Sequence, residues 1–126
     1  MFKDTKAFSG FAVSDIPQAK AFYNDILGLD VTDAQGMLTL HIAGGTTIII
    51  YPKPDHTPAT YTILNFPVDQ IDQAVDTLTQ RGVHFEHYDM PDLKTDEKGI
   101  ARDDRGPQIA WFKDPSGNIL SVLQER

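Results

Sequence analysis

The chain has 126 residues, of which 40% are hydrophobic and 23% charged, as expected for one globular domain. Its formal net charge of -7 and pI near 4.8 would repel a phosphate backbone or an anionic lipid surface, so we expect neither nucleic acid nor a membrane as a partner. The absence of Cys excludes disulfides, thiolate metal sites and cysteine nucleophiles. Residues 1–6 lack the apolar segment of a signal peptide, and apolar stretches such as 48–51 are only strand-sized, so we expect a cytoplasmic protein.

The first part of the chain predicts one strand, one helix and three further strands. After a strand at residues 7–13, the segment Ser14-Asp15-Ile16-Pro17 is typical of a helix start, with a polar cap and Pro in the first turn. Apolar residues then follow at helical spacing up to Leu27, and Gly28 ends the helix. The remaining strands are predicted at residues 29–32, 37–43 and 46–51, the last two joined at Gly44-Gly45.

The same order of elements is predicted again after a linker. Residues 52–58 contain three prolines and no periodicity, which favours a connection between halves. A helix is predicted at residues 69–81, stopped by Gly82, and a long polar stretch at 89–106 contains a short strand near 99–101. The other strands of this half are predicted at residues 61–68, 83–88, 108–112 and 119–123, the last two joined by a turn at 114–118.

The order β-α-β-β-β therefore occurs in two modules, about residues 1–55 and about 59–126. Residues of the first strand and helix align with those of the second module at a shift of 55 positions, as Phe8 does with Ile63, and the shift grows to 72 after the long polar stretch, as for Ile49 with Ser121. This repeat predicts an α+β domain, and a repeat of this kind can pack in a pseudo-twofold arrangement, with two curled sheets facing each other across a cleft. Clefts of this kind are common ligand sites.

Three segments carry a resemblance to a known family. They are Phe11 to Gly28 with its Val-Ser-Asp and Phe-Tyr pairs, Phe66-Pro67-Val68-Asp69, and the turn from Trp111 to Asn118. Their order and spacing resemble the signatures of the glyoxalase/bleomycin-resistance/dioxygenase superfamily, also called the vicinal oxygen chelate superfamily. The resemblance implies paired βαβββ modules that form an open cup, usually in a homodimer.

In metal-using members of that family, four inward positions hold a divalent ion with His, Glu or Gln. Carried over by motif, these positions are Phe8, Ile49, Ile63 and Ser121 in this sequence. Phenyl and alkyl groups offer no lone pair, and one Ser hydroxyl is a poor ligand for Zn, Ni or Fe. The resemblance therefore transfers the fold and the cup, and we expect neither a metal ion nor another cofactor.

Other residues are candidates for lining the cup. Tyr51 shares a strand face with Ile49, and Asn65 shares one with Ile63. Trp111, the single Trp of the chain, lies where the family keeps an aromatic near the cup. For all three, a role in ordinary packing or backbone hydrogen bonding is an equal alternative.

Two further groups of polar residues have a plain and a functional interpretation. Arg102 and Arg105 lie in the long polar stretch, which is either a solvated, self-paired loop or a lid that offers an arginine to an anionic ligand. His84 and Glu86 share a face of a predicted strand, either as an exposed polar pair or as an acid–base or metal pair. Ser121 has neither the base nor the orienting group that a nucleophilic Ser needs.

The leading hypothesis is binding of an unidentified small, partly apolar molecule in the cup without a metal ion, as in the metal-free branch that the bleomycin-binding resistance proteins exemplify. One alternative is an enzyme of the superfamily, a lyase, isomerase or dioxygenase that uses a relocated metal or acid–base residues. Another is a regulatory domain that presents its acidic surface to a basic protein.

Overall fold

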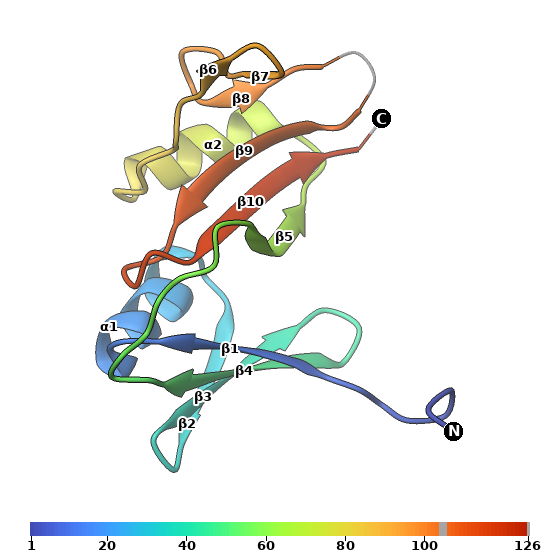
Figure 1. Cartoon of the computed structure of the whole chain (residues 1–126), viewed down its shortest axis with the longest axis vertical. Coiled ribbons are helices and arrows are strands. Elements are labelled where there is room, and N and C mark those ends of the chain that lie inside the picture. The colour runs from blue at the N-terminus through green and yellow to red at the C-terminus, as the bar shows by residue number, and fades with distance from the viewer. Residues whose placement is uncertain (104–105, 126) are drawn as a thin grey trace. The chain divides into compact units, whose positions relative to one another are not determined.

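The computed structural model describes residues 1–103 and 106–125. The chain divides into two compact units, Met1–Thr57 and Pro58–Arg126. Each unit contains a four-stranded mixed sheet and one helical segment, which Figure 1 shows in chain order by colour. The predicted α+β fold of two βαβββ-like modules is therefore confirmed.

The sheet of the first unit has the strand order β1-β4-β3-β2, with β1 parallel to β4 and the other pairs antiparallel. Its strands are β1 (Ser9–Val13), β2 (Asp30–Ala34), β3 (Met37–Ile42) and β4 (Thr46–Pro52). A two-residue turn joins β2 to β3, and both of its residues, Gln35 and Gly36, have positive φ, of 57° and 77°. Such a turn matches the twist of the hairpin and fixes its register.

The helical segment of this unit changes type along its length. Helix α1 (Ile16–Lys20) begins at Asp15, whose carboxylate accepts a hydrogen bond from the Gln18 amide at 2.9 Å. From Ala21 to Ile26 the segment continues as the π-helix η1, and the Leu27 amide donates to the Phe22 carbonyl five residues earlier. The prediction of one continuous helix is thus right in extent and wrong in type.

One face of the first sheet forms a core with this helical segment. The core residues Leu38, Leu40 and Ile50 are fully buried, and the Tyr23 ring lies 5.1 Å from that of Phe22. Because strand side chains alternate, the residues between them on β3 and β4 point to the opposite, open face.

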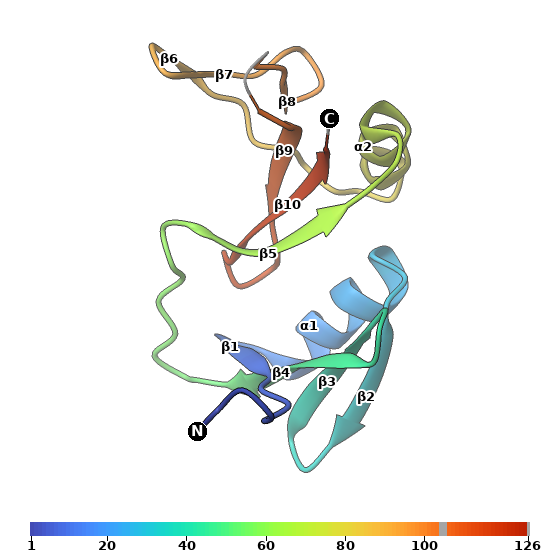
Figure 2. The same ribbon diagram turned by 90° about the vertical axis from the view of Figure 1, so that its right-hand side faces the viewer.

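The second unit repeats this arrangement with the strand order β5-β10-β9-β8 (Figure 2). Helix α2 (Ile71–Gln80) contacts β9 and β10. A separate two-stranded ribbon pairs β6 with β7. The strands of this unit are β5 (Thr62–Pro67), β6 (Asp89–Met90), β7 (Leu93–Lys94), β8 (Ile100–Ala101), β9 (Gln108–Lys113) and β10 (Ile119–Gln124).

The strand predicted at residues 83–88 is wrong. This segment makes only an isolated bridge, between Phe85 and Phe112, and one neighbouring hydrogen bond of 2.8 Å from the Glu86 amide to the Trp111 carbonyl. The place beside β9 is taken farther along by β8, which pairs with Ala110 and Ile109. Beside this segment, β9 therefore offers only its end beyond Ala110, and the pairing stays a single bridge.

The predicted turn between β9 and β10 is present and tightly hydrogen-bonded. Oδ1 of the buried Asp114 accepts from the amides of Ser116 and Asn118, and Oδ2 accepts from the Asn118 side chain, each at 2.9 Å. This closed network explains why two polar side chains are buried at a hairpin turn.

Candidate functional site

Three of the predicted ligand-binding residues lie together on the second sheet. Ser121 on β10 is the register partner of Asn65 on β5 and of Trp111 on β9, so the three side chains project from one face. Their neighbour Phe112 belongs to the other face, since its ring packs against Phe85 at 5.4 Å and Phe85 lies in a pocket beside α2. We call the face of Asn65, Trp111 and Ser121 the open face of the second unit.

The Asn65 amide on this face has a fixed orientation. The fully buried Ser121 hydroxyl donates a hydrogen bond of 2.5 Å to Asn65 Oδ1. The Asn65 side chain is exposed, and its Nδ2 has no partner among the described residues. An oriented amide nitrogen of this kind presents two donors to an acceptor on a ligand.

Aromatic rings lie on the same face, with Trp111 one strand beyond β10. Trp111 Nε1 donates to Thr62 Oγ1 at 3.0 Å, and the Tyr88 ring stands edge-on to the Trp111 ring with centroids 5.7 Å apart. Both rings are half-buried, so part of each is open to solvent. Sequence reasoning missed Thr62 and Tyr88. Thr62 lies beside a shift in the register between β5 and β10. Ile119 pairs with Thr62 and Leu120 with Leu64, so Ile63 is an extra residue of β5.

The open face also carries one ion pair. Glu86 and Lys113 lie 3.3 Å apart, and Lys113 is two residues from Trp111 on the same strand. The predicted pairing of Glu86 with His84 is not what the structure contains, because the segment is not a strand and Glu86 turns to Lys113.

The candidates in the first unit lie on the sheet face away from its buried core. Ile49 alternates with the buried Ile48 and Ile50, and Tyr51 follows on the same side with 43% of its surface exposed. Phe8 precedes β1 and is 68% exposed. The cup that the two units are expected to form stays a prediction.

A polar pair on the first sheet was also missed. Thr32 Oγ1 and His41 Nε2 are hydrogen-bonded at 2.6 Å, and the register of Thr32 with Thr39 and of Thr39 with Ile49 places the pair on the face of Ile49. Nothing near His41 in the sequence indicates this partner, which lies nine residues earlier. The signal that finds its partner is the two-residue turn at 35–36, which sets the register of the hairpin.

The residues predicted to occupy the family's four metal-ligand positions do not fit a metal ion. Phe8, Ile49 and Ile63 have no donor atom, and the Ser121 hydroxyl is already committed to Asn65. Among residues 1–103 and 106–125, no three His, Asp or Glu side chains are grouped so that they could hold an ion. That the protein works without a metal or another cofactor stays a prediction.

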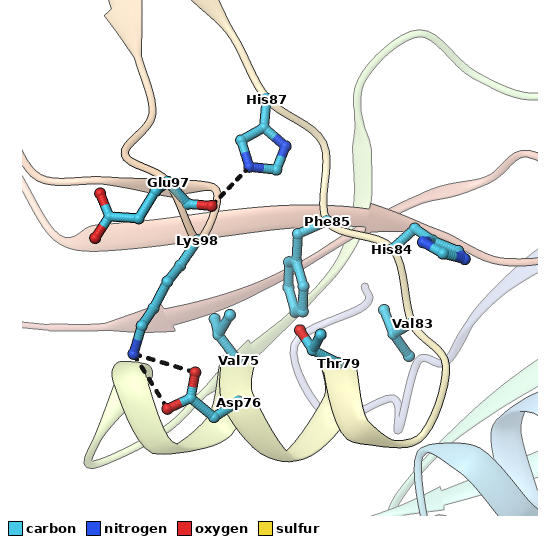
Figure 3. A pocket seen from close by; sticks show the side chains of 9 residues that line it. All are labelled: Val75, Asp76, Thr79, Val83, His84, Phe85, His87, Glu97 and Lys98. Atoms are coloured by element: carbon cyan, nitrogen blue, oxygen red, sulfur yellow. Dashed lines mark hydrogen bonds and ion pairs between the residues drawn. The ribbon is translucent and has the colours of Figure 1, made fainter.

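A pocket of about 300 Å³ lies on the helix side of the second unit. It is enclosed by α2, by the segment from Val83 to His87 and by Glu97 with Lys98 (Figure 3). The His84 ring points away from the middle of the pocket, whereas His87 Nε2 donates to the Glu97 carbonyl at 3.1 Å. The pocket is therefore bounded by contacts between α2 and the long polar stretch.

The long stretch is also held by Arg102, whose three guanidinium nitrogens are all engaged. Nε donates to Asp96 at 2.9 Å, Nη2 donates to Asp72 at 2.7 Å, and Nη1 donates to Gln108. The hydrogen bond from Arg102 is the main reason that the pKa of Asp72 lies below its ordinary value of 3.8. The predicted role of Arg102 in ligand binding is not tested, and Arg105 lies outside the described residues.

Within the described ranges, no helix is long and apolar enough to cross a membrane.

Comparisons with known proteins identify the family. No curated protein sequence matches the chain. Among solved structures, the fosfomycin resistance protein FosX from Listeria monocytogenes is similar with a TM-score of 0.72 and 15% identity, over 95% of this chain and 92% of that one. TnmS3, an antibiotic binding protein from Streptomyces sp. CB03234, is similar with a TM-score of 0.66 and 22% identity, over 95% and 96% of the two chains.

A third similar structure is a superfamily member from Sphaerobacter thermophilus DSM 20745, with a TM-score of 0.69 and 24% identity over 94% of this chain and 97% of that one. At these identities the likeness shows the fold alone. The family model of the Glyoxalase/Bleomycin resistance protein/Dioxygenase superfamily matches residues 8–122, which is most of both units. The chain therefore belongs to the Glyoxalase/Bleomycin resistance protein/Dioxygenase superfamily.

Proposed function

We propose that this protein binds a small, partly apolar molecule on the open face of the second unit, without a metal ion at the family's ligand positions. The observation that carries the proposal is the Asn65 amide, which Ser121 orients and whose Nδ2 has no partner among the described residues, on the same sheet face as the Trp111 ring. Ordered donors beside aromatic surface are typical of sites for small molecules. Binding in the cytoplasm by a homodimer stays part of the same proposal.

The chemistry of the face defines the class of ligand. Trp111 and Tyr88 offer ring surface to an aromatic or alicyclic group. Asn65 Nδ2 donates to an acceptor such as a carbonyl or ether oxygen. The similar structures named for antibiotic binding and fosfomycin resistance support a search among antibiotics and aromatic metabolites.

The test uses Trp111 as its own reporter, because it is the only Trp in the chain. A panel of such compounds is titrated into the protein in the presence of EDTA, and binding is followed by Trp fluorescence and by calorimetry. A ligand that saturates without added metal is the expected result. Binding that requires Ni, Mn, Zn or Fe(II) contradicts the metal-independent part of the proposal.

Asn65→Asp tests the role of the amide at nearly constant shape. Asp keeps the oxygen that accepts from Ser121 and replaces the Nδ2 donor by an acceptor, so affinity is expected to fall about tenfold or more. Gln73→Glu introduces the same charge change on the exposed side of α2 and is the matched control. Equal affinity of Asn65→Asp and the wild type would place the site elsewhere.

One observation favours the enzyme alternative. The imidazole of His41 is exposed and hydrogen-bonded to Thr32. In this position it could accept a proton from a ligand bound on the same face, as a general base does. Any ligand found is therefore recovered after incubation and analysed by mass spectrometry. A product whose formation is lost in His41→Gln supports catalysis, and an unchanged ligand supports binding alone.

A further inference from the structure

The segment from His87 to Arg102, which we call the strap, joins the open face of the second unit to helix α2. It begins two residues after Phe85, which makes a bridge with Phe112 of β9. It ends just after β8, which pairs with Ala110 and Ile109 of the same strand. Figures 1 and 2 show it passing beyond the edge of the sheet, with the small ribbon of β6 and β7 at its far end.

At its first end, the strap carries one wall of the proposed site. Tyr88 stands edge-on to Trp111, and its backbone is held by Thr95 from the returning part of the strap. The Tyr88 amide donates to Thr95 Oγ1 and the Thr95 amide donates to the Tyr88 carbonyl, both at 2.9 Å. The position of the Tyr88 ring therefore depends on where the strap lies.

At its other end, two cations attach the strap to α2. Arg102 Nη2 lies 2.7 Å from Asp72, and Lys98 Nζ lies 3.1 Å from Asp76 and 3.6 Å from Asp72. Figure 3 shows the bond between Lys98 and Asp76 at one side of the pocket and the bond from His87 to the Glu97 carbonyl above it.

The partner of Arg102 inside the strap is itself fixed. Asp96 Oδ1 accepts from the amides of Lys98 and Ile100, both at 2.9 Å, while Oδ2 accepts from Arg102 Nε. Arg102 thus connects a closed loop of the strap to the helix. A single exposed ion pair contributes little, but a planar guanidinium shared among three acceptors acts as one rigid connection.

We propose that Arg102 is a positioning residue for the open face: by attaching the strap to α2 at Asp72, it holds Tyr88 against Trp111. The strap is then a fastened wall of the site, in place of a lid that offers a free arginine to the ligand. The consequence for ligand binding rests on the proposed function, whereas the position of Tyr88 does not.

The first experiment needs no ligand. Acrylamide quenching of Trp111 is measured in the wild type, Arg102→Ala, Arg102→Lys and the control Lys94→Ala. The control removes an exposed cation of the strap that lies outside the cluster of ion pairs between the strap and α2, which consists of Asp72, Asp76, Asp96, Lys98 and Arg102. Quenching is expected to rise in Arg102→Ala and to stay at the wild-type level in Lys94→Ala. Arg102→Lys keeps the charge but cannot bridge three acceptors, so it should lie between them.

A double-mutant cycle separates positioning from general loosening. In a Tyr88→Ala background the ring is absent, so adding Arg102→Ala should leave Trp111 quenching unchanged. A further rise in that background, or no rise in the single variant, overturns the proposal. If Arg102→Ala fails to fold, the wild type in ~1 M NaCl, where the screening length is about 3 Å, replaces it and must show the same rise.

Ligand binding then distinguishes the two proposals. Changed quenching in a protein that binds none of the tested compounds leaves Arg102 as the positioning residue and contradicts the proposed function. Where ligands are known, Arg102→Ala should lower the affinity for aromatic ligands by a larger factor than the affinity for ligands that use only the Asn65 amide. Equal factors would show that the strap does not act through Tyr88.

Discussion

Gly99 occupies a tight position in the strap. Its φ is +90°, and a Cβ at this position would lie 3.0 Å from the Glu86 carbonyl oxygen and 3.0 Å from Phe85 Cβ. Both neighbours are held by the edge of β9, through the Phe85 bridge and the Glu86 hydrogen bond, so neither can easily move away. A side chain would therefore meet an unfavourable φ and a steric clash at once.

We expect Gly99→Ala to destabilise the protein by about 2 kcal/mol or more, in urea unfolding followed by circular dichroism. The matched control is Gly36→Ala in the hairpin turn, whose φ is +77° and whose Cβ would meet nothing within 4 Å. That variant isolates the cost of φ, about 1 kcal/mol. If the two variants lose the same free energy of unfolding, the backbone around Gly99 shifts enough to accommodate the added Cβ.

Ser121 shows what sequence reasoning reached at this scale. The repeat and the turn motif placed it on an inward position, and its chemistry excluded a useful metal ligand. Its actual role, as a buried donor that orients Asn65, depends on a partner 56 residues away. No local pattern encodes such a pair, because the register of parallel strands is set by packing over the whole sheet.

The two helices begin at equivalent positions of the repeat but are capped differently. Asp15 caps α1 through the Gln18 amide, and the residue 55 positions later is Gln70, whose side chain makes no cap. The first amide of α2, that of Ile71, is satisfied by Gln124 Oε1 at the end of β10, at 2.9 Å. A tertiary contact thus replaces a local signal that the sequence lacks.

Gln70→Asp should install in α2 the cap that α1 already has, with the Gln73 amide as donor in place of that of Gln18. We expect a gain of about 1 kcal/mol in the free energy of unfolding. Gln70→Glu adds the same charge near the helix N-terminus on a side chain too long for this cap, so it should gain only about 0.5 kcal/mol. If the two variants are equally stable, the gain comes from charge and not from capping.

Elements were predictable where their signals are local. The strand and turn pattern, Gly28 and the turn at 114–118 were found because periodicity and turn residues mark them. The segment 83–88 was mistaken for a strand because its composition fits one, while strand formation also depends on how much of the edge of β9 is left by β8. The π-helix and the register shift beside Ile63 were missed because no local residue pattern marks either feature.

For the whole molecule, the repeated order of elements and three motifs were sufficient to identify the superfamily, and the match over residues 8–122 confirms it. The ligand could not be predicted in the same way, because it depends on side chains that the fold does not constrain. The excess of 18 acidic over 11 basic residues makes the pH response a test at this scale. Asp72 of α2 and Asp96 of the strap, which share Arg102, are two of the groups through which it acts.

Stability should decrease in acid partly through Asp72 and Asp96. The hydrogen bond from Arg102 lowers the pKa of Asp72, with burial opposing it and the charges of Arg102 and Lys98 adding to it. For Asp96, burial raises the pKa, but hydrogen bonds from the Ile100 amide, from Arg102 and from the Lys98 amide, together with the charge of Arg102, outweigh it, and the net pKa is lowered. Because both folded-state values lie below the ordinary 3.8, the unfolded chain binds protons first, and these groups stabilise the fold above that pH.

This contribution is fully present near neutral pH and is lost as the pH falls below 3.8 through the folded-state values. Urea unfolding at a series of pH values from about 7 down to about 3 should therefore show a shallower loss of stability in Asp72→Asn than in the wild type. Asp92→Asn, which removes an exposed carboxylate of the strap outside the cluster, should follow the wild-type slope. If Asp72→Asn also runs parallel to the wild type, the ion pairs between the strap and α2 do not persist in solution, and Arg102 cannot hold the strap in place.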